Sequence, residues 1–147
     1  MMNERVNEMT TFDFGNGPVP AHRHPNGGGW VADTTTVSET AYVGSDARVY
    51  GNVRLTGNVR VFDNARVYGN AVVTDYARVT GNAKVSGKAE VSGDAWVDGN
   101  AEVSGDARVY DNAWVYGNAR VYDNARVYGN AWVYGGAEVS AHTYRNE

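Results

Sequence analysis

The sequence predicts an all-β protein whose chain winds into a triangular β-solenoid, and three repeating features predict it. A large aliphatic residue recurs every six positions from Val31 to Val139, at 19 positions without interruption. A small residue, most often Ala, stands four positions after each of them. Between the two lies a pair drawn mainly from Gly, Asp and Asn, which accept left-handed backbone angles at little cost. Each group of six residues is therefore expected to form a short strand and a corner.

The strands are expected to be three residues long, as in Arg66-Val67-Tyr68, with the aliphatic side chain inward and both neighbours outward. A helix does not explain the pattern. Six residues turn a helix by about 240°, so the valines would spiral around its surface instead of lining one side.

Outward residues recur every 18 positions, which predicts three groups of six per coil. Trp96, Trp114 and Trp132 have this spacing. The same step joins a column of alternating charge, formed by Lys84, Glu102, Arg120 and Glu138. Stacked strands lie about 4.8 Å apart, so such columns bring like aromatics and opposite charges together. We expect about six coils and a prism about 30 Å long.

Three segments are expected along the chain. Residues 1–30 precede the repeat and form an N-terminal cap or a flexible arm; residues 31–143 form the β-helix; residues 144–147 form a C-terminal tail. A cap is expected from Phe12, Phe14 and the segment 18–25, because the first coil of a solenoid exposes an apolar end and unpaired strand edges.

Composition limits the partners and the location. The chain of 147 residues has a net charge of −4, which opposes a nucleic-acid partner, and it has no cysteine for disulfides or thiolate metal sites. It shows no signal peptide and no apolar run of about 18 residues, so we expect a soluble protein, cytoplasmic or virion-associated, without a membrane partner.

The phrase V-Y-G-N-A-R resembles the hexapeptide repeat of left-handed parallel β-helix proteins, over residues 31–143. The resemblance implies a left-handed coil, whereas parallel crossovers in general favour the right hand. The best-known members are acyltransferases that use coenzyme A or acyl carrier protein, usually as parallel trimers with active sites between subunits and a histidine base near a protruding loop. Here the repeat has no inserted loop, and no histidine occurs between His24 and His142. An acyl-CoA-dependent acyltransferase is therefore kept only as an alternative.

The chain also resembles the uninterrupted GNARVY-type repeat proteins of bacteria, prophages and phages. This resemblance implies a non-enzymatic structural or binding module, phage- or prophage-related, without a cofactor. His22 and His24 leave a metal ion short of ligands, so no metal site is expected. No catalytic residue is assigned.

The surface expected to carry function is aromatic. Its candidate residues share the outward positions of one side of the prism; they are Trp96, Trp114, Trp132, Tyr116, Tyr134 and Arg78. Three interpretations are open. The rings strengthen the ladder, with Arg78 placed for a cation–π contact to Trp96. They form the contact of a homo-oligomer, by family analogy a parallel trimer. Or they bind a partner protein or a glycan.

Overall fold

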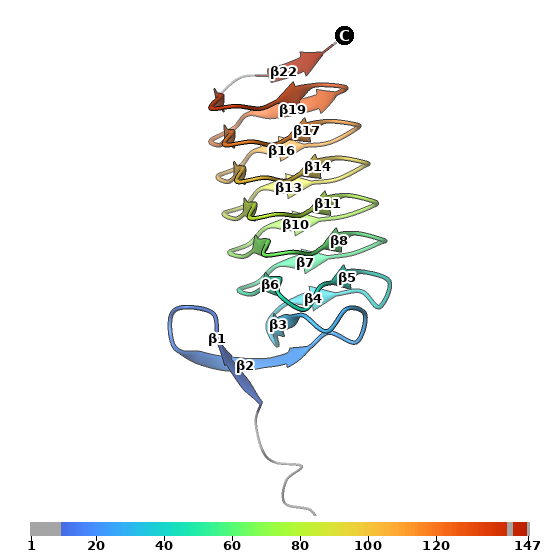
Figure 1. Ribbon diagram of the computed structural model, residues 1–147, viewed down its shortest axis with the longest axis vertical. Coiled ribbons are helices and arrows are strands. Elements are labelled where there is room, and N and C mark those ends of the chain that lie inside the picture. The colour runs from blue at the N-terminus through green and yellow to red at the C-terminus, as the bar shows by residue number, and fades with distance from the viewer. Residues whose placement is uncertain (1–9, 141–142, 147) are drawn as a thin grey trace, which may run out of the picture.

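The computed structural model describes residues 10–140 and 143–146, and their regular structure is entirely β. Parts of the predicted cap or arm (residues 1–9) and of the C-terminal region (residues 141, 142 and 147) lie outside the described residues. The chain rises in stacked coils along one axis (Figure 1). The described residues contain no helix, and so none that is long and apolar enough to span a bilayer.

The strands form three sheets, which we call face 1, face 2 and face 3. Face 1 contains β1 (Thr11–Asp13), β2 (Pro18–Arg23), β3 (Trp30–Ala32), β6 (Arg48–Val49), β9 (Arg66–Val67), β12 (Lys84–Val85), β15 (Glu102–Val103), β18 (Arg120–Val121) and β21 (Glu138–Val139). Face 2 contains β4 (Thr36–Val37), β7 (Arg54–Leu55), β10 (Val72–Val73), β13 (Glu90–Val91), β16 (Arg108–Val109), β19 (Arg126–Gly129) and β22 (Thr143–Asn146). Face 3 contains β5 (Tyr42–Val43), β8 (Arg60–Val61), β11 (Arg78–Val79), β14 (Trp96–Val97), β17 (Trp114–Val115) and β20 (Trp132–Val133).

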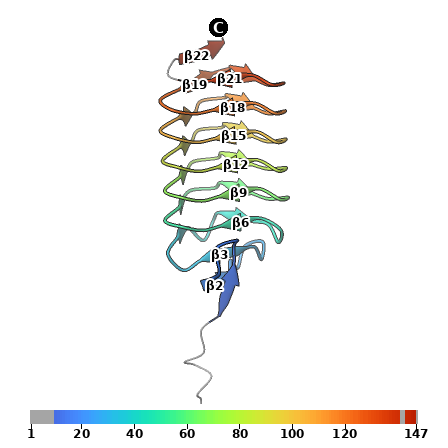
Figure 2. The same ribbon diagram turned by 90° about the vertical axis from the view of Figure 1, so that its left-hand side faces the viewer.

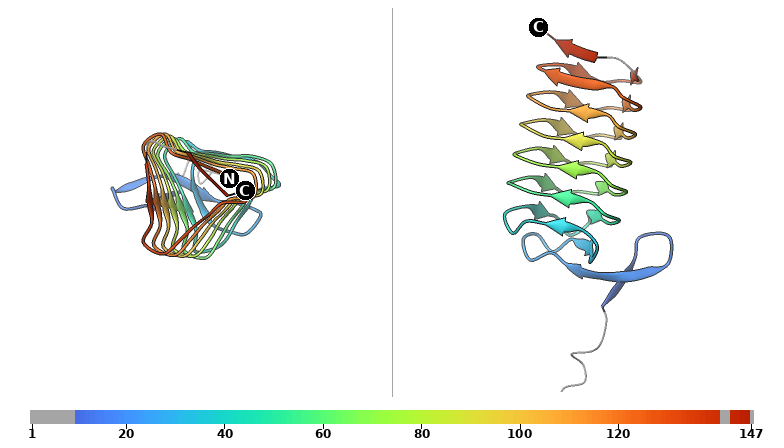
Figure 3. Two further views of the ribbon diagram at one scale, coloured as in Figure 1. Left: turned by 90° about the horizontal axis from the view of Figure 1, so that it is seen from above. Right: turned by 180° about the vertical axis from the view of Figure 1, so that it is seen from behind.

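Consecutive strands of a solenoid face are parallel and 18 residues apart, which confirms the predicted coil. Val79 pairs with Val97, and Val97 pairs with Val115. Figure 2 shows the strands of face 1 above one another, and the view along the axis in Figure 3 shows the coils superposed as a triangle. Most strands hold two residues, but pairing extends to the third position, as where Tyr68 N–H donates to Val85 O at 2.9 Å.

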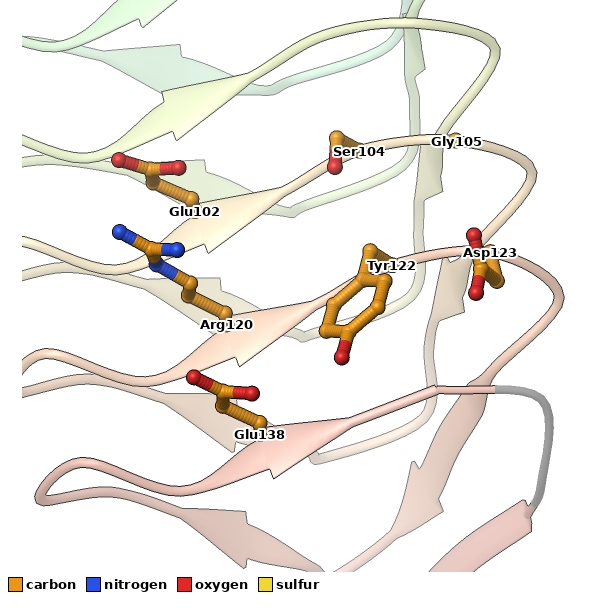
Figure 4. A pocket seen from close by; sticks show the side chains of 7 residues that line it. All are labelled: Glu102, Ser104, Gly105, Arg120, Tyr122, Asp123 and Glu138. Carbon is orange, nitrogen blue, oxygen red and sulfur yellow. The ribbon is translucent and has the colours of Figure 1, made fainter.

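The coil is left-handed, as the family resemblance implies. On the near side of Figure 4 the chain runs from left to right between Glu102 and Gly105. It descends from Glu102 through Arg120 to Glu138 in the same view. A chain that moves to the right on the near side while it descends follows a left-handed path.

The core is the predicted aliphatic column with its small neighbours. Leu55 and the valines from Val43 to Val127 are fully buried, as are the alanines and valines four positions after them. The inward side chains of all three faces meet along the axis, so each coil buries its apolar residues only against the coils next to it.

The corners from Gly51 to Gly135 depend on left-handed backbone at their first residue, which is Gly or Asp. Gly69 has φ +73, and a Cβ built there lies 3.0 Å from the backbone nitrogen of Gly87 in the next coil. Asp63 has φ 59, and its Oδ2 accepts the N–H of Gly81 at 3.3 Å. Asp75 and Asp111 accept the amides of Gly93 and Gly129 in the same way, at 3.0 and 3.1 Å. An aspartate at a corner therefore hydrogen-bonds the glycine amide above it.

The described part of the N-terminal segment lies against the first coil. β1 and β2 form an antiparallel hairpin, and β2 continues face 1 by pairing antiparallel with β3. Phe14 is buried and stacks on Tyr50, with ring centroids 4.8 Å apart. Gly29 N–H donates to Val43 O at 2.9 Å, so this segment also satisfies backbone groups at the first strand of face 3.

The six-residue period ends after β21. β22 pairs with β19 so that Val127 lies opposite Tyr144, a step of 17 residues instead of 18. The backbone therefore stays parallel in face 2 while the repeat loses its register.

Candidate interaction surface

Face 3 brings all six predicted interaction residues together. Arg78, Trp96, Trp114 and Trp132 occupy equivalent positions on β11, β14, β17 and β20, which are neighbours in the sheet. Tyr116 and Tyr134 lie two residues after the last two tryptophans, in a second outward column. We call these six residues the aromatic face.

The first column of the aromatic face is a continuous stack. The rings of Trp96 and Trp114 are 5.1 Å apart between centroids and inclined by 10°. The guanidinium carbon of Arg78 lies 5.2 Å from the centroid of Trp96, which confirms the predicted cation–π contact. Because Arg78 and Trp114 come from the strands on either side of β14, both flat sides of the Trp96 ring are covered and its edge faces outward.

Trp132 departs from this stack, and the indole hydrogen bonds supply the physical reason. Trp96 Nε1–H donates to Thr80 Oγ1 at 3.4 Å, and Trp114 Nε1–H donates to Asp98 Oδ2 at 3.3 Å. Both acceptors stand 16 residues before the tryptophan, and Tyr116 holds that position for Trp132. Among the described residues no group accepts the Trp132 N–H, and the ring is inclined by 78° to Trp114, with centroids 5.8 Å apart.

The most exposed aromatic side chains of the described residues lie on face 3 or at its border. Their exposed fractions are 62% for Tyr76, 56% for Tyr134 and 52% for Trp132. Tyr76 is a corner residue two positions before Arg78 of β11. Sequence reasoning missed Tyr76; the signal that finds it is a tyrosine at a corner position that Asn, Asp or Thr holds in most other repeats.

Asp98 is the acidic group that the aromatic face contacts directly. Partial burial raises the pKa of its carboxyl above the usual 3.8, and the hydrogen bond from Trp114 opposes that shift. Like Thr80, Asp98 was missed by sequence reasoning, although the spacing of 16 residues from a tryptophan identifies both.

The two described histidines have local partners. His24 is buried, and its Nε2 lies 2.8 Å from Ala41 O. His22 Nδ1 lies 2.7 Å from Asp33 Oδ1, and both side chains are about half exposed. In residues 10–140 and 143–146 no three His, Cys, Asp or Glu side chains are grouped so that they could hold a metal ion.

A second feature is a shallow depression of about 290 Å³ on face 1, shown in Figure 4. The depression lies beside the small residues Ser104 and Gly105, and Tyr122 and Asp123 also line it. Glu102, Arg120 and Glu138 lie along one side in adjacent strands, as the alternating-charge column predicts. Within the described residues these three groups form no ion pair at 4.0 Å or less, so they attract one another across wider, solvated distances.

The family model described as the YdcK beta-solenoid repeat matches parts of the chain. It matches residues 59–75, 65–81, 101–117 and 119–135. The chain is a β-solenoid repeat protein. Each matched segment of this solenoid is close to one coil and contains one strand from each face, as residues 59–75 contain β8, β9 and β10. No curated protein and no solved structure matches it. The hexapeptide-repeat and GNARVY-type likenesses therefore stay resemblances.

Proposed function

We propose that this solenoid is a non-enzymatic structural module that associates with further copies of itself through the aromatic face. The observation that carries the proposal is the placement of the three exposed aromatic rings, Tyr76, Trp132 and Tyr134, on or beside one face of a three-sided prism. Exposed aromatic surface is typical of protein interaction sites, because burying it releases water from large apolar areas.

The rest of the surface supports the choice of this face. Stacked tyrosine pairs also occur on faces 1 and 2, where Tyr50 lies on Tyr68 and Tyr110 on Tyr128, each at 5.1 Å and 4°. All four of these rings are partly buried. They strengthen the ladder in the way the first interpretation expects, whereas Trp132 and Tyr134 leave about half of their surface in water.

The lack of a histidine base in the coils also supports a structural role. The acyltransferases that the repeat resembles need a histidine base beside the acceptor group, and the sequence from residue 25 to residue 141 contains none. The two described histidines lie in the segment before the first coil, where His22 contacts Asp33 and His24 contacts the carbonyl oxygen of Ala41. A rigid, uninterrupted rod suits the phage- or prophage-related scaffold that the GNARVY-type resemblance implies.

Glycan binding is a second candidate, and one observation favours it at a single residue. Sugars stack on the flat side of an aromatic ring, and in Trp96 both flat sides are covered. Trp132 alone combines a half-exposed ring, turned away from the stack, with an indole N–H that has no partner in the described residues. Binding on a glycan array that is lost in Trp132→Ala at unchanged mass and melting temperature favours this candidate.

The proposed function is tested by sedimentation velocity over a range of protein concentrations. We expect the wild-type mass to rise above the 15.9 kDa of one chain, and the double variant Trp132→Ser/Tyr134→Ser to stay monomeric while it keeps a cooperative melting transition. The matched control is Tyr110→Ser/Tyr122→Ser, which removes two outward tyrosines from faces 2 and 1 and is expected to associate normally. A wild-type chain that is monomeric at every concentration, or a face 3 variant that associates like the wild type, overturns the proposal.

A further inference from the structure

The outward residues of face 3 divide into two halves of different chemistry. Along the first column, from β5 to β20, the order is Tyr42, Arg60, Arg78, Trp96, Trp114 and Trp132. The N-terminal half thus presents mainly guanidinium groups and the C-terminal half presents indole rings. Arg60 and Arg78 are exposed, and no described acidic group lies within ion-pair distance of either.

A two-fold axis that runs along the strand direction would place two copies of face 3 against each other with their coils in opposite order. Such an axis keeps each column opposite its own copy and inverts the heights. With six strands in the face, Arg78 then lies opposite Trp96 of the second copy, and Arg60 lies opposite Trp114. Arginine and aromatic residues are the types enriched at the centre of protein interfaces. At the ends of the column, Tyr42 lies opposite Trp132.

The second outward column is complementary under the same operation. Its order is Gly44, Phe62, Thr80, Asp98, Tyr116 and Tyr134. Inversion places the exposed ring of Tyr134 over Gly44, beside the side chains of Tyr42 and Phe62. It places Phe62 opposite Tyr116, and it places Asp98 opposite the buried Thr80, whose hydroxyl already accepts the Trp96 N–H. The two tyrosines of this column therefore lie opposite uncharged residues of the second copy, Gly44 and Phe62.

The distribution of charge along the axis favours the same arrangement. Residues 31–88 contain seven Lys and Arg against five Asp and Glu, whereas residues 89–140 contain three Lys and Arg against eight Asp and Glu. Two copies in opposite order place the basic half of one beside the acidic half of the other. Copies side by side in the same order, as in the parallel trimer of the family analogy, place equal charges at equal heights.

The area is sufficient for a reversible dimer. Six strands about 4.8 Å apart and a side about six residues wide, at about 3.3 Å per residue, bury about 1,100 Å² between two copies. Specific interfaces start at about 1,200 Å², so this contact lies at the small end, where association depends on concentration.

We infer that the occupant of the aromatic face is a second copy of this chain in antiparallel orientation, related by a two-fold axis between β11 and β14. This inference rests on the proposed function and adds the geometry of the contact. It places Asp46, just after Gly44, close to Gly136 of the second copy, because these corners lie at the same border of face 3 and at opposite ends of it.

The test uses single cysteines, which are unambiguous because the natural chain has none. Asp46 is exposed, and a Cβ at Gly136 meets no atom within 4 Å, so Asp46→Cys and Gly136→Cys leave the fold intact. We expect a short bis-maleimide to cross-link an equimolar mixture of the two variants into dimers. Neither variant alone is expected to cross-link, because like corners are then separated by five coils, about 24 Å.

Sedimentation of the same samples separates the two proposals. Association without a cross-link in the mixture overturns the antiparallel geometry and leaves self-association in place. Cross-linking of either variant alone also overturns it. Monomers at every concentration overturn the proposed function itself. Adding Trp132→Ser to the Gly136→Cys chain is expected to abolish the cross-link, which ties it to the aromatic face.

Discussion

At the scale of single residues, the corners show how a monotonous repeat still distinguishes its positions. The first corner residue has a positive φ whether it is Gly69 or Asp63. Glycine adopts this conformation without strain, whereas a residue with a Cβ is strained by about 1–2 kcal/mol. Aspartate offsets part of that strain by accepting the amide of the glycine one coil later, as Asp75 does from Gly93.

This reasoning predicts different effects for two substitutions of Gly69. Gly69→Ala is expected to lower the free energy of unfolding by about 1–2 kcal/mol, because its Cβ meets the Gly87 backbone and its φ is unfavourable. Gly69→Asp is expected to be less harmful, since its carboxylate can accept the Gly87 amide. Urea unfolding measures both, with Gly136→Ala as the control at an unobstructed corner residue. An aspartate that destabilises more than alanine would contradict the account.

The raised pKa of Asp98 predicts that the stability of the folded chain depends on pH. The pKa of this carboxyl is raised in the folded chain, mainly by burial, so the folded state is favoured as pH falls toward 3.8 and loses that contribution as pH rises through the folded pKa. Asp98→Asn keeps an oxygen for the Trp114 N–H and removes the buried charge. We expect its melting temperature to exceed that of the wild type by up to about 2 °C at pH 7, with a difference that disappears below pH ~3.5.

The control for Asp98→Asn is Asp106→Asn, which removes the same charge from an exposed corner. A pH-independent difference, or the same profile in both variants, would show that burial of the Asp98 carboxyl is not the cause.

At the scale of elements, the strands are too short to be stable alone, and their columns hold them together. Trp114 illustrates this, because its ring touches Trp96, Tyr116 and Trp132 and its N–H reaches Asp98. One residue of β17 thereby links three strands of face 3 in addition to the backbone ladder.

Trp114→Ala is expected to lower the free energy of unfolding by about 2 kcal/mol, because it removes three ring contacts and a hydrogen bond. Trp132→Ala removes one edge contact, and we expect a loss below about 1 kcal/mol. Urea unfolding of dilute protein compares them without a contribution from association. Equal losses would mean that the stack does not stabilise the solenoid.

The elements also show what sequence could and could not predict. The step of six residues fixes which side chains point inward, so the core from Val43 to Val133 and the coil of 18 residues follow from counting. Segments outside the repeat do not follow in this way. The β1–β2 hairpin depends on tertiary contacts such as Phe14 on Tyr50, and β22 pairs one residue out of register.

The candidate surface, like the fold, could be predicted from the sequence only in part. Periodicity placed Trp96, Trp114 and Trp132 in one column, but it treats them as equivalent. The structure distinguishes them, because the residue 16 positions earlier decides whether the indole N–H finds an acceptor. That relation joins neighbouring strands of face 3, which come from successive coils.

At the scale of the whole molecule, three faces with one shared core present three different surfaces. Face 1 carries the alternating charges around the depression, face 2 carries stacked tyrosines among arginines, and face 3 carries the aromatic face. Because the core is the same in every coil, the outward residues can change without changing the fold. This independence is why a repetitive chain can still hold one specific contact surface.

The most direct test of the central claim is acrylamide quenching of tryptophan fluorescence at increasing protein concentration. The chain has four tryptophans, and Trp132 is the most exposed of them. We predict that the readily quenched fraction falls over the same concentrations at which the sedimenting mass rises, and that Trp132→Phe lacks this fraction throughout. Quenching that stays constant while the mass rises would contradict the claim that the chains meet through the aromatic face.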